Sequence, residues 1–317
     1  QLIRVHAAVL GLLCVLATAS ASTATATTAF LVRKGPTWSL ARQDLATAFA
    51  SRTAGSTTNS FSVPSGRRHR KKSPPGVMFA SSSTKGGSAK SKIVRGSDDA
   101  LFGCVERNHL ISGRTTFGEF LDAGTGSHSL RWIASLLHNE RTGAEGEGED
   151  KPLSVSRFAA VTADENMRKK VLAEAEELGI EDMGEILIGN WAAEVEGDGE
   201  VGEKTELCHG QQYDTILADY LVGAIDGFAP YFQDQVFSRL ARHLRPGGRM
   251  YVVGLNPIPD KAPGDADLFC RVTRLRDACI KLAGHRCYRE YPPAWIERHL
   301  RLAGLEVVET SRFPIMY

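Results

Sequence analysis

The chain has 317 residues, of which 42% are hydrophobic and 24% are charged. This composition is typical of a globular protein, and it excludes a membrane bundle and a disulfide scaffold. Residues 1–90 hold 12 Lys/Arg and a single acid, Asp44, whereas the other 227 residues hold 26 basic and 36 acidic side chains. The second part is therefore acidic, which argues against a surface that binds nucleic-acid phosphates.

The first 21 residues predict a secretory signal peptide. Arg4 precedes an apolar run over residues 5–19, and small residues, including Ala19 and Ala21, follow it. The apolar core is too short to cross a bilayer comfortably. We therefore expect no membrane span in the mature protein.

Residues 22–90 have the composition of a targeting segment that does not fold. They are rich in Ser and Thr, carry scattered Arg and Lys, and are nearly free of acids. The junction Thr28-Ala29-Phe30 resembles that of the bipartite presequences of algae with secondary plastids. This resemblance implies import into the plastid stroma by way of the secretory pathway, and the alternative is secretion with a basic tail.

The cysteines predict neither a disulfide framework nor a metal site. Cys14 falls in the signal segment, and the other five form no C-x-x-C pair and no zinc spacing. Free thiols agree with a reducing compartment.

From residue 116 to residue 317, short β-rich runs alternate with helical periods. This pattern predicts an α/β domain with a mostly parallel sheet. One or two helices over residues 91–115 are expected to cap that sheet. The expected strands cover residues 119–122, 157–161, 185–188, 214–218, 249–253 and 305–310.

Apolar spacing predicts the helices between these strands. One stripe runs from Met167 to Leu178 and ends at Gly179, a typical C-terminal glycine. Another runs from Phe232 to Leu244 and stops at Pro246. Further helices are expected over residues 272–282 and from residue 293 onward. Two acidic, glycine-rich loops at 143–150 and 194–212 are expected as solvated insertions.

The first strand ends in the sequence Asp122-Ala-Gly124-Thr125-Gly126. A strand that feeds a glycine turn and then a helix lets backbone amides approach a ligand, because the glycines lack a Cβ. By itself, the motif is equally compatible with a structural turn.

Together with four later segments, this motif resembles the series found in class I S-adenosylmethionine-dependent methyltransferases. The resemblance implies a three-layer Rossmann-like fold with helices on both faces of the sheet, and S-adenosylmethionine as the cofactor. The later segments, in family order, are residues 161–167, 188–191, 213–219 and 240–253.

The resemblance implies a role for each matching residue. Asp122, Gly124, Thr125 and Gly126 would surround the methionine end of the cofactor, with Asp122 reaching its ammonium group. A carboxylate suits that cationic partner.

The remaining cofactor contacts are expected at the ends of the next two strands. Asn190 would contact the adenine edge, and Trp191 would pack either on its face or in the core. The family places an acid for the ribose where this chain has Thr162, and Asp164 follows two residues later. Either Asp164 reaches back to the hydroxyls or Thr162 binds them alone.

Two further departures from the family pattern stand out. His128 occupies the place of the third glycine, near a helix N-terminus, where we expect the dipole to disfavour its protonated form. The family's seventh, antiparallel strand is not recognisable after residue 310, so we expect a truncated C-terminus.

Methyl transfer requires alignment of nucleophile, methyl carbon and sulfur, and a base only for some acceptors. The candidates for such a base are Asp219, Tyr220 and His128. Residues 219–235 form the expected acceptor pocket, with Tyr291 and Trp295 as further candidates for its wall. We expect a small-molecule acceptor, and the sequence says nothing about the oligomeric state.

Two alternatives stay open. An aminopropyltransferase also carries an acid after its fourth strand, here Asp219, and uses a decarboxylated relative of the same cofactor. A non-catalytic assembly or regulatory protein that keeps the fold would explain the altered positions Thr162 and His128.

Overall fold

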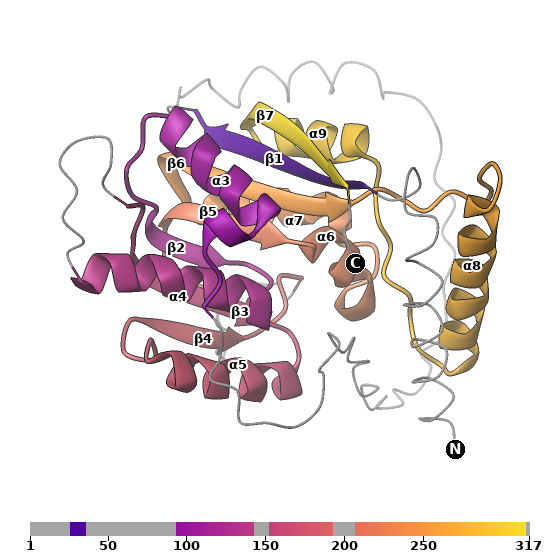
Figure 1. Cartoon of the computed structure of the whole chain (residues 1–317), viewed down its shortest axis with the longest axis horizontal. Coiled ribbons are helices and arrows are strands. Elements are labelled where there is room, and N and C mark those ends of the chain that lie inside the picture. The colour runs from indigo at the N-terminus through magenta and orange to yellow at the C-terminus, as the bar shows by residue number, and fades with distance from the viewer. Residues whose placement is uncertain (1–25, 36–92, 143–151, 193–206, 315–317) are drawn as a thin grey trace, which may run out of the picture.

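A computed structural model of the chain describes residues 26–35, 93–142, 152–192 and 207–314. The described part contains one seven-stranded sheet with the order β4-β3-β2-β5-β6-β1-β7 (Figure 1). Strand β1 runs antiparallel to both of its neighbours, and the strands from β4 to β6 are mutually parallel. The strands are β1 (Ala26–Lys34), β2 (Gly118–Asp122), β3 (Val155–Thr162), β4 (Gly184–Ile188), β5 (Tyr213–Asp219), β6 (Leu244–Leu255) and β7 (Leu305–Pro314).

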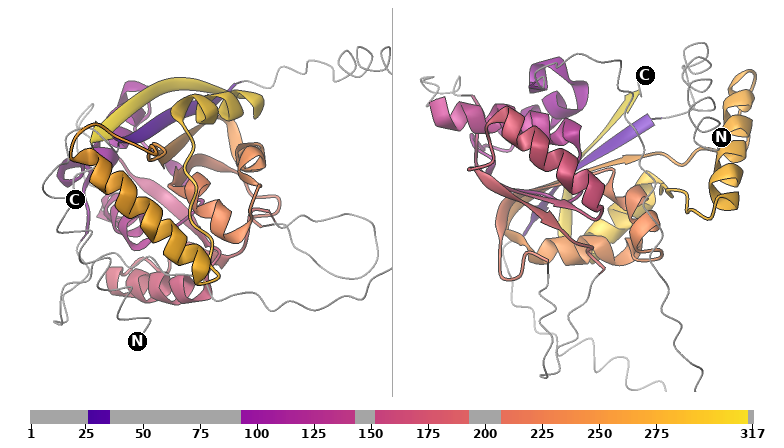
Figure 2. Two further views of the ribbon diagram at one scale, coloured as in Figure 1. Left: turned by 90° about the vertical axis from the view of Figure 1, so that its right-hand side faces the viewer. Right: turned by 90° about the horizontal axis from the view of Figure 1, so that it is seen from below.

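Helices cover both faces of this sheet, which confirms the predicted three-layer α/β architecture. One hydrophobic cluster joins the sheet to α3 (Ala100–Ile111), α4 (Ser127–Thr142) and α5 (Glu165–Leu178). A second cluster joins the opposite face to α6 (Leu221–Phe228), α7 (Gln233–Arg242) and α9 (Pro293–Leu302). Figure 2 shows α8 (Ala266–Leu282) standing outside these layers. A short 3-10 helix, η1 (Gly96–Asp98), precedes α3.

Strand β1 contradicts the expectation that residues 22–90 do not fold. Its side chains alternate between the two clusters, with Phe30 and Val32 in one and Ala29 and Leu31 in the other. A strand that is buried on both faces reads as a continuous apolar run. Composition averaged over the Ser/Thr-rich segment hid this short run.

The position of β1 also bears on two other expectations. The sequence showed no antiparallel strand after the sixth strand, and in the structure an antiparallel strand, β1, comes from the N-terminal side of the chain and lies between β6 and β7. The expected cleavage junction lies within the strand, where Thr28, Ala29 and Phe30 pair with residues 254, 253 and 252 of β6. The signal segment over residues 1–21 lies outside the described residues.

The predicted strands after residue 116 are all present, with shifted boundaries. The largest shift is in β6, which begins at Leu244 because that residue already pairs with Tyr213 of β5. Gly179 ends α5 in the left-handed conformation with φ 66°, as its position predicted. The expected cap over residues 91–115 consists of η1 and α3.

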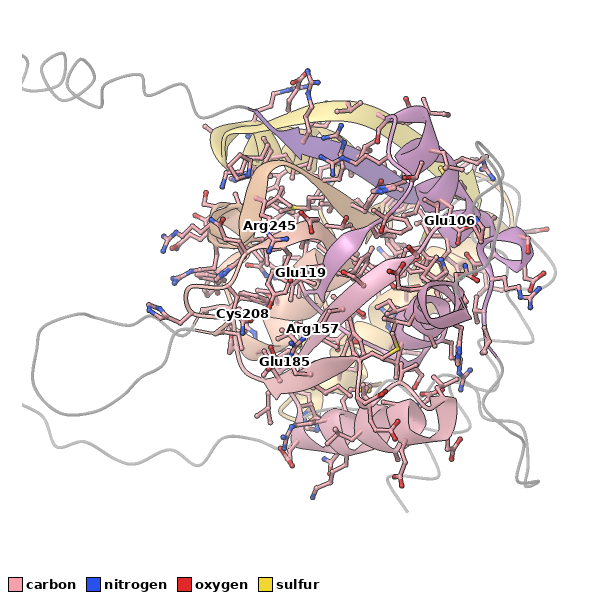
Figure 3. All side chains as sticks on the ribbon, turned by 90° about the vertical axis from the view of Figure 1, so that its left-hand side faces the viewer. Glu106, Glu119, Arg157, Glu185, Cys208 and Arg245 are labelled. Carbon is pink, nitrogen blue, oxygen red and sulfur yellow. The ribbon has the colours of Figure 1, made fainter. Side chains whose placement is uncertain are left out.

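The amino edge of the sheet carries an ionic network. Arg245 contacts Glu119 at 2.6 Å and Asp214 at 2.7 Å, and Asp214 also accepts a hydrogen bond from the backbone N–H of Glu119 at 3.0 Å. Figure 3 shows Glu119 and Arg245 together at this edge. The network joins β2, β5 and β6 at the end opposite to the glycine turn.

None of the helices in the described part of the chain combines the length and hydrophobicity that crossing a bilayer would require. Within that same part, no group of three or more His, Cys, Asp or Glu side chains is arranged to hold a metal ion.

Candidate active site

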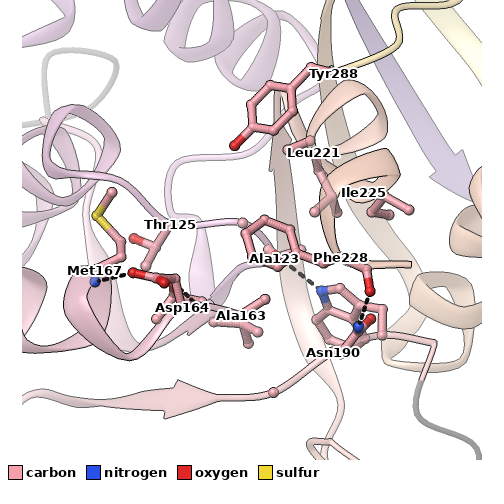
Figure 4. A pocket seen from close by; sticks show the side chains of 16 residues that line it. Ala123, Thr125, Ala163, Asp164, Met167, Asn190, Leu221, Ile225, Phe228 and Tyr288 are labelled. Atoms are coloured by element: carbon pink, nitrogen blue, oxygen red, sulfur yellow. Dashed lines mark hydrogen bonds between the residues drawn. The ribbon is translucent and has the colours of Figure 1, made fainter. Parts of the chain in front are cut away.

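A pocket of about 200 Å³ lies at the carboxyl ends of the neighbouring strands β2 and β5. The glycine turn, residues 123–126, follows β2 and lies beside this pocket. Ligands of open parallel sheets bind at this edge. Figure 4 shows Asp164 and Met167 on one side of the pocket and Leu221 and Phe228 on the other. The complete lining comprises Ala123, Gly124, Thr125, Val161, Thr162, Ala163, Asp164, Met167, Gly189, Asn190, Trp191, Leu221, Ala224, Ile225, Phe228 and Tyr288.

Two carboxyl groups end the adjacent strands β2 and β5. Asp122 is fully buried, and its Oδ2 atom has no hydrogen-bond partner among the described residues. The Oδ1 atom of Asp219 is buried and lacks such a partner as well. Buried polar atoms of this kind call for an explanation, and a ligand is one.

Burial opposes the ionisation of both carboxyl groups, and the charge of Asp122 further opposes that of Asp219. Burial raises the pKa of Asp122 to about 6. Burial, and then the negative charge of Asp122, raise the pKa of Asp219 to about 7. A cation between these groups would lower both pKa values, because it favours the charged form of a carboxyl group.

The two glycines of the turn have different surroundings. Gly124 lines the pocket, and a Cβ atom there would lie 3.0 Å from Cδ1 of Leu221. Gly126 does not line the pocket; its carbonyl oxygen accepts a hydrogen bond from the backbone N–H of Leu130 at 3.1 Å. Gly124 is thus placed for ligand approach, while Gly126 belongs to the first turn of α4.

The structure brings Thr162 and Asp164 to the pocket together, at the end of β3. Asp164 caps α5, because its Oδ1 atom accepts a hydrogen bond from the backbone N–H of Met167 at 2.8 Å. The hydroxyl of Thr162 lies 3.4 Å from the backbone nitrogen of Asp164 and accepts its hydrogen. Capping holds Asp164 in place at the pocket wall.

Asn190 and Trp191 also line the pocket, but both side chains already have protein partners. The Asn190 amide donates to the carbonyl of Phe228 at 3.1 Å and accepts from the backbone N–H of Ala192 at 3.0 Å. The indole N–H of Trp191 donates to the carbonyl of Ala123 at 2.7 Å. Trp191 is only 5% exposed, so its ring is both core and pocket wall.

None of the three base candidates, Asp219, Tyr220 and His128, lines the pocket. Tyr220 follows β5 in the left-handed conformation, with φ 49°, and its phenol turns to Thr27 of β1 at 3.2 Å. His128 lies with its Nε2 atom 3.0 Å from Oδ2 of Asp99. Among the three candidates, Asp219 alone has a buried polar atom without a partner.

The expectation for the charge of His128 is wrong. The hydrogen bond to Asp99 raises its pKa, although the ring lies in the first turn of α4. A carboxylate in direct contact outweighs the partial charge of a helix end. Asp99 belongs to the capping segment before the sheet, and its contact with His128 was not visible from sequence spacing.

The expected acceptor segment is only partly at the pocket. Phe228 lines it, whereas Phe232 is buried in the core and Tyr231 is 76% exposed. Tyr291 and Trp295 stack on each other with ring centroids 4.1 Å apart and pack against the core.

Sequence reasoning missed Tyr288 and the helix α6. Tyr288 reaches the pocket from a segment far along the chain. The sequence of α6 contains two glycines, so it looked like a loop, although its Leu221 and Ile225 share one helical face.

No protein-family model matches the sequence, and no curated protein resembles it significantly. Solved structures resemble it at low identity. An O-methyltransferase family 2 protein from Planctomyces limnophilus DSM 3776, in complex with apigenin, is 12% identical, with a TM-score of 0.35, over 61% of this chain and 45% of that one. An S-adenosylmethionine-dependent methyltransferase from Clostridium acetobutylicum ATCC 824 is 11% identical, with a TM-score of 0.33, over 63% and 77%.

The [4+2]-cyclase SpnF is 15% identical, with a TM-score of 0.29, over 47% of this chain and 43% of that one. The chain thus spans less than half the length of this cyclase and of the Planctomyces protein. The order of the seven strands, the antiparallel β1 and the helices on both faces define the architecture. The chain has a three-layer, Rossmann-like α/β fold.

Proposed function

We propose that the protein transfers a methyl group from S-adenosylmethionine to a small-molecule acceptor. The observation that carries the proposal is the pair Asp122 and Asp219 beside a glycine turn, each with one buried carboxyl oxygen, Oδ2 and Oδ1 respectively, that lacks a partner among the described residues. The cofactor has an ammonium group and a sulfonium centre, and both are positive charges that suit this pair.

Asp122, which is buried and does not line the pocket, and four residues of the pocket lining have distinct roles in this proposal. Asp122 binds the ammonium group, Thr162 and Asp164 bind the ribose hydroxyls, and Asn190 and Trp191 border the adenine. When bound, the cofactor supplies an electrophilic methyl group. The apolar wall over α6 excludes water and orients the acceptor, and such alignment can contribute up to about 7–11 kcal/mol in ideal cases.

Calorimetric titration with S-adenosylmethionine tests the proposal. We expect micromolar binding, and a loss of roughly tenfold or more in Asp122→Asn, because a hydrogen-bonded charge contributes more than about 1.4 kcal/mol. Gly124→Ala should also weaken binding, since the added methyl group must displace Leu221 at the pocket. Gly35→Ala is the matched control, because a Cβ atom there meets nothing within 4 Å.

Three outcomes would change the proposal. Absence of heat at millimolar cofactor would favour a non-catalytic protein that keeps only the fold. Tighter binding of the decarboxylated cofactor would favour aminopropyl transfer. Equal affinity of Asp122→Asn and the wild type would remove Asp122 from the ammonium site.

A further inference from the structure

A second and larger cavity lies next to the cofactor pocket. Its volume is about 600 Å³, and it is bounded by α8, the loop that follows β6 and residues 284–290. Tyr288 lines both this cavity and the cofactor pocket. Figure 4 shows the Tyr288 ring near Leu221, on the other side of the pocket from Asn190. The two spaces therefore meet at one side chain, and we name the second one the α8 cavity.

Glu290 is held in the wall of the α8 cavity by backbone contacts. A Cβ atom on Gly223 of α6 would lie 2.2 Å from its Oε1 atom, so only glycine permits this approach. The backbone N–H of Leu255, at the carboxyl end of β6, donates to the carboxylate. The backbone N–H of Arg289 donates to the carbonyl of Gly223 at 3.2 Å.

This geometry gives Glu290 the properties of a general base. Burial raises its pKa to about 7, and a base is most effective when its pKa lies near the working pH. The charged groups that line the same cavity include Asp226 from α6, Arg274 and Asp277 from α8, and Arg289 from its own segment. No described side chain forms a hydrogen bond or ion pair with Glu290.

The α8 cavity is lined by five Lys and Arg side chains and by four acids, Asp226, Asp260, Asp277 and Glu290. Arg276 pairs with Asp277, and Arg286 pairs with Asp226. Three further cations, Arg274, Lys281 and Arg289, line the cavity without an ion-pair partner among the described residues. Guanidinium groups in such positions suit a carboxylate or a phosphate.

We propose that the α8 cavity binds the methyl acceptor, an anionic small molecule with a hydroxyl nucleophile, and that Glu290 accepts the hydroxyl proton. The new bond joins the acceptor oxygen to the methyl carbon, while the bond between that carbon and the sulfonium sulfur breaks. The sulfur keeps the electron pair, and the proton passes to the Glu290 carboxylate. This inference rests on the proposed methyl transfer.

The binding test compares two probes, 3,4-dihydroxybenzoate and catechol, which differ by one carboxylate. Both are titrated into protein saturated with S-adenosylhomocysteine, so that cofactor binding is established first and its failure is recognised separately. We expect the carboxylated probe to bind roughly tenfold tighter. The double variant Arg274→Gln/Arg289→Gln should lose that preference, and Arg298→Gln, on α9 outside the cavity, should keep it.

The rate of methyl transfer to 3,4-dihydroxybenzoate tests Glu290. Glu290→Gln should lower the rate about a hundredfold or more and remove the rise of the rate with pH near 7, without changing the affinity for either ligand. Glu290→Asp should restore part of the rate. Equal affinity for the two probes, binding of neither, absence of transfer by the wild type, or an unchanged pH profile in Glu290→Gln would overturn the inference.

Discussion

The phenol of Tyr220 lies 3.2 Å from the hydroxyl of Thr27, although 193 positions separate them in the sequence. Tyr220 directly follows Asp219 at the candidate active site, and Thr27 is the second residue of β1. The N-terminal strand thus contacts the residue that precedes α6. We infer that the sheet position of β1 supports the geometry of the carboxyl edge.

The mature N-terminus should therefore lie before Ala26. We propose plastid import for the protein, but cleavage at the Ala29–Phe30 junction would remove Ala26–Ala29 from β1, together with the Thr27 contact. A chain that starts at Phe30 should have a lower Tm than one that starts at Ser22. Mass spectrometry of the protein from its source checks the processing site, and a mature chain starting at Phe30 would contradict this prediction.

Side chains of β1 should contribute strongly to stability. Phe30 is 2% exposed in the core, so Phe30→Ala should lower the free energy of unfolding by about 3–5 kcal/mol. Arg33 of the same strand has a half-exposed side chain paired with Glu306, and Arg33→Ala should cost far less than Phe30→Ala because solvent screens an exposed ion pair. Urea unfolding measures both, and equal effects would mean that β1 is not in the sheet.

Sequence periodicity predicted most of the fold because each strand after residue 116 carries its own local pattern. The glycine turn was equally local, since Gly124 lies two positions after Asp122, the last residue of β2. In contrast, β1 could not be found this way, because its partners Val252 and Thr310 lie more than two hundred residues away. Tertiary contact overrode a composition that predicted no structure.

The same limit applies to the charges of the site. The pairing of His128 with Asp99 depends on how the cap folds over α4, which no spacing in the sequence encodes. Glu290 stands among many glutamates in the sequence. What distinguishes Glu290 is that its carboxylate lies against the backbone of Gly223, and this contact is seen only in the folded structure.

Gly118 should be sensitive to substitution for two separable reasons. Gly118 and Gly113 both have left-handed backbone, with φ 65° and 77°. A Cβ atom on Gly113 meets nothing within 4 Å, so Gly113→Ala should cost about 1–2 kcal/mol of backbone strain. On Gly118 it would lie 2.9 Å from Cβ of Asp214 and displace the partner of Arg245, so Gly118→Ala should cost clearly more. Equal losses in thermal unfolding would contradict this reading.

The raised pKa of Asp219 predicts how stability depends on pH without cofactor. The native carboxyl keeps its proton up to pH about 7, whereas the unfolded one releases it near its ordinary pKa of 3.8. Between these values the native state binds more protons, so the free energy of unfolding decreases as the pH rises. Asp219→Asn removes this decrease. At pH 8 its free energy of unfolding should exceed that of the wild type by on the order of 2 kcal/mol, and at pH 4 it should not.

Asp265→Asn, at an exposed residue before α8 without a capping hydrogen bond, is the control. If thermal unfolding showed the same pH slope for Asp219→Asn and the wild type, Asp219 would be ionised in the native state, and the buried acid pair would not need a cation.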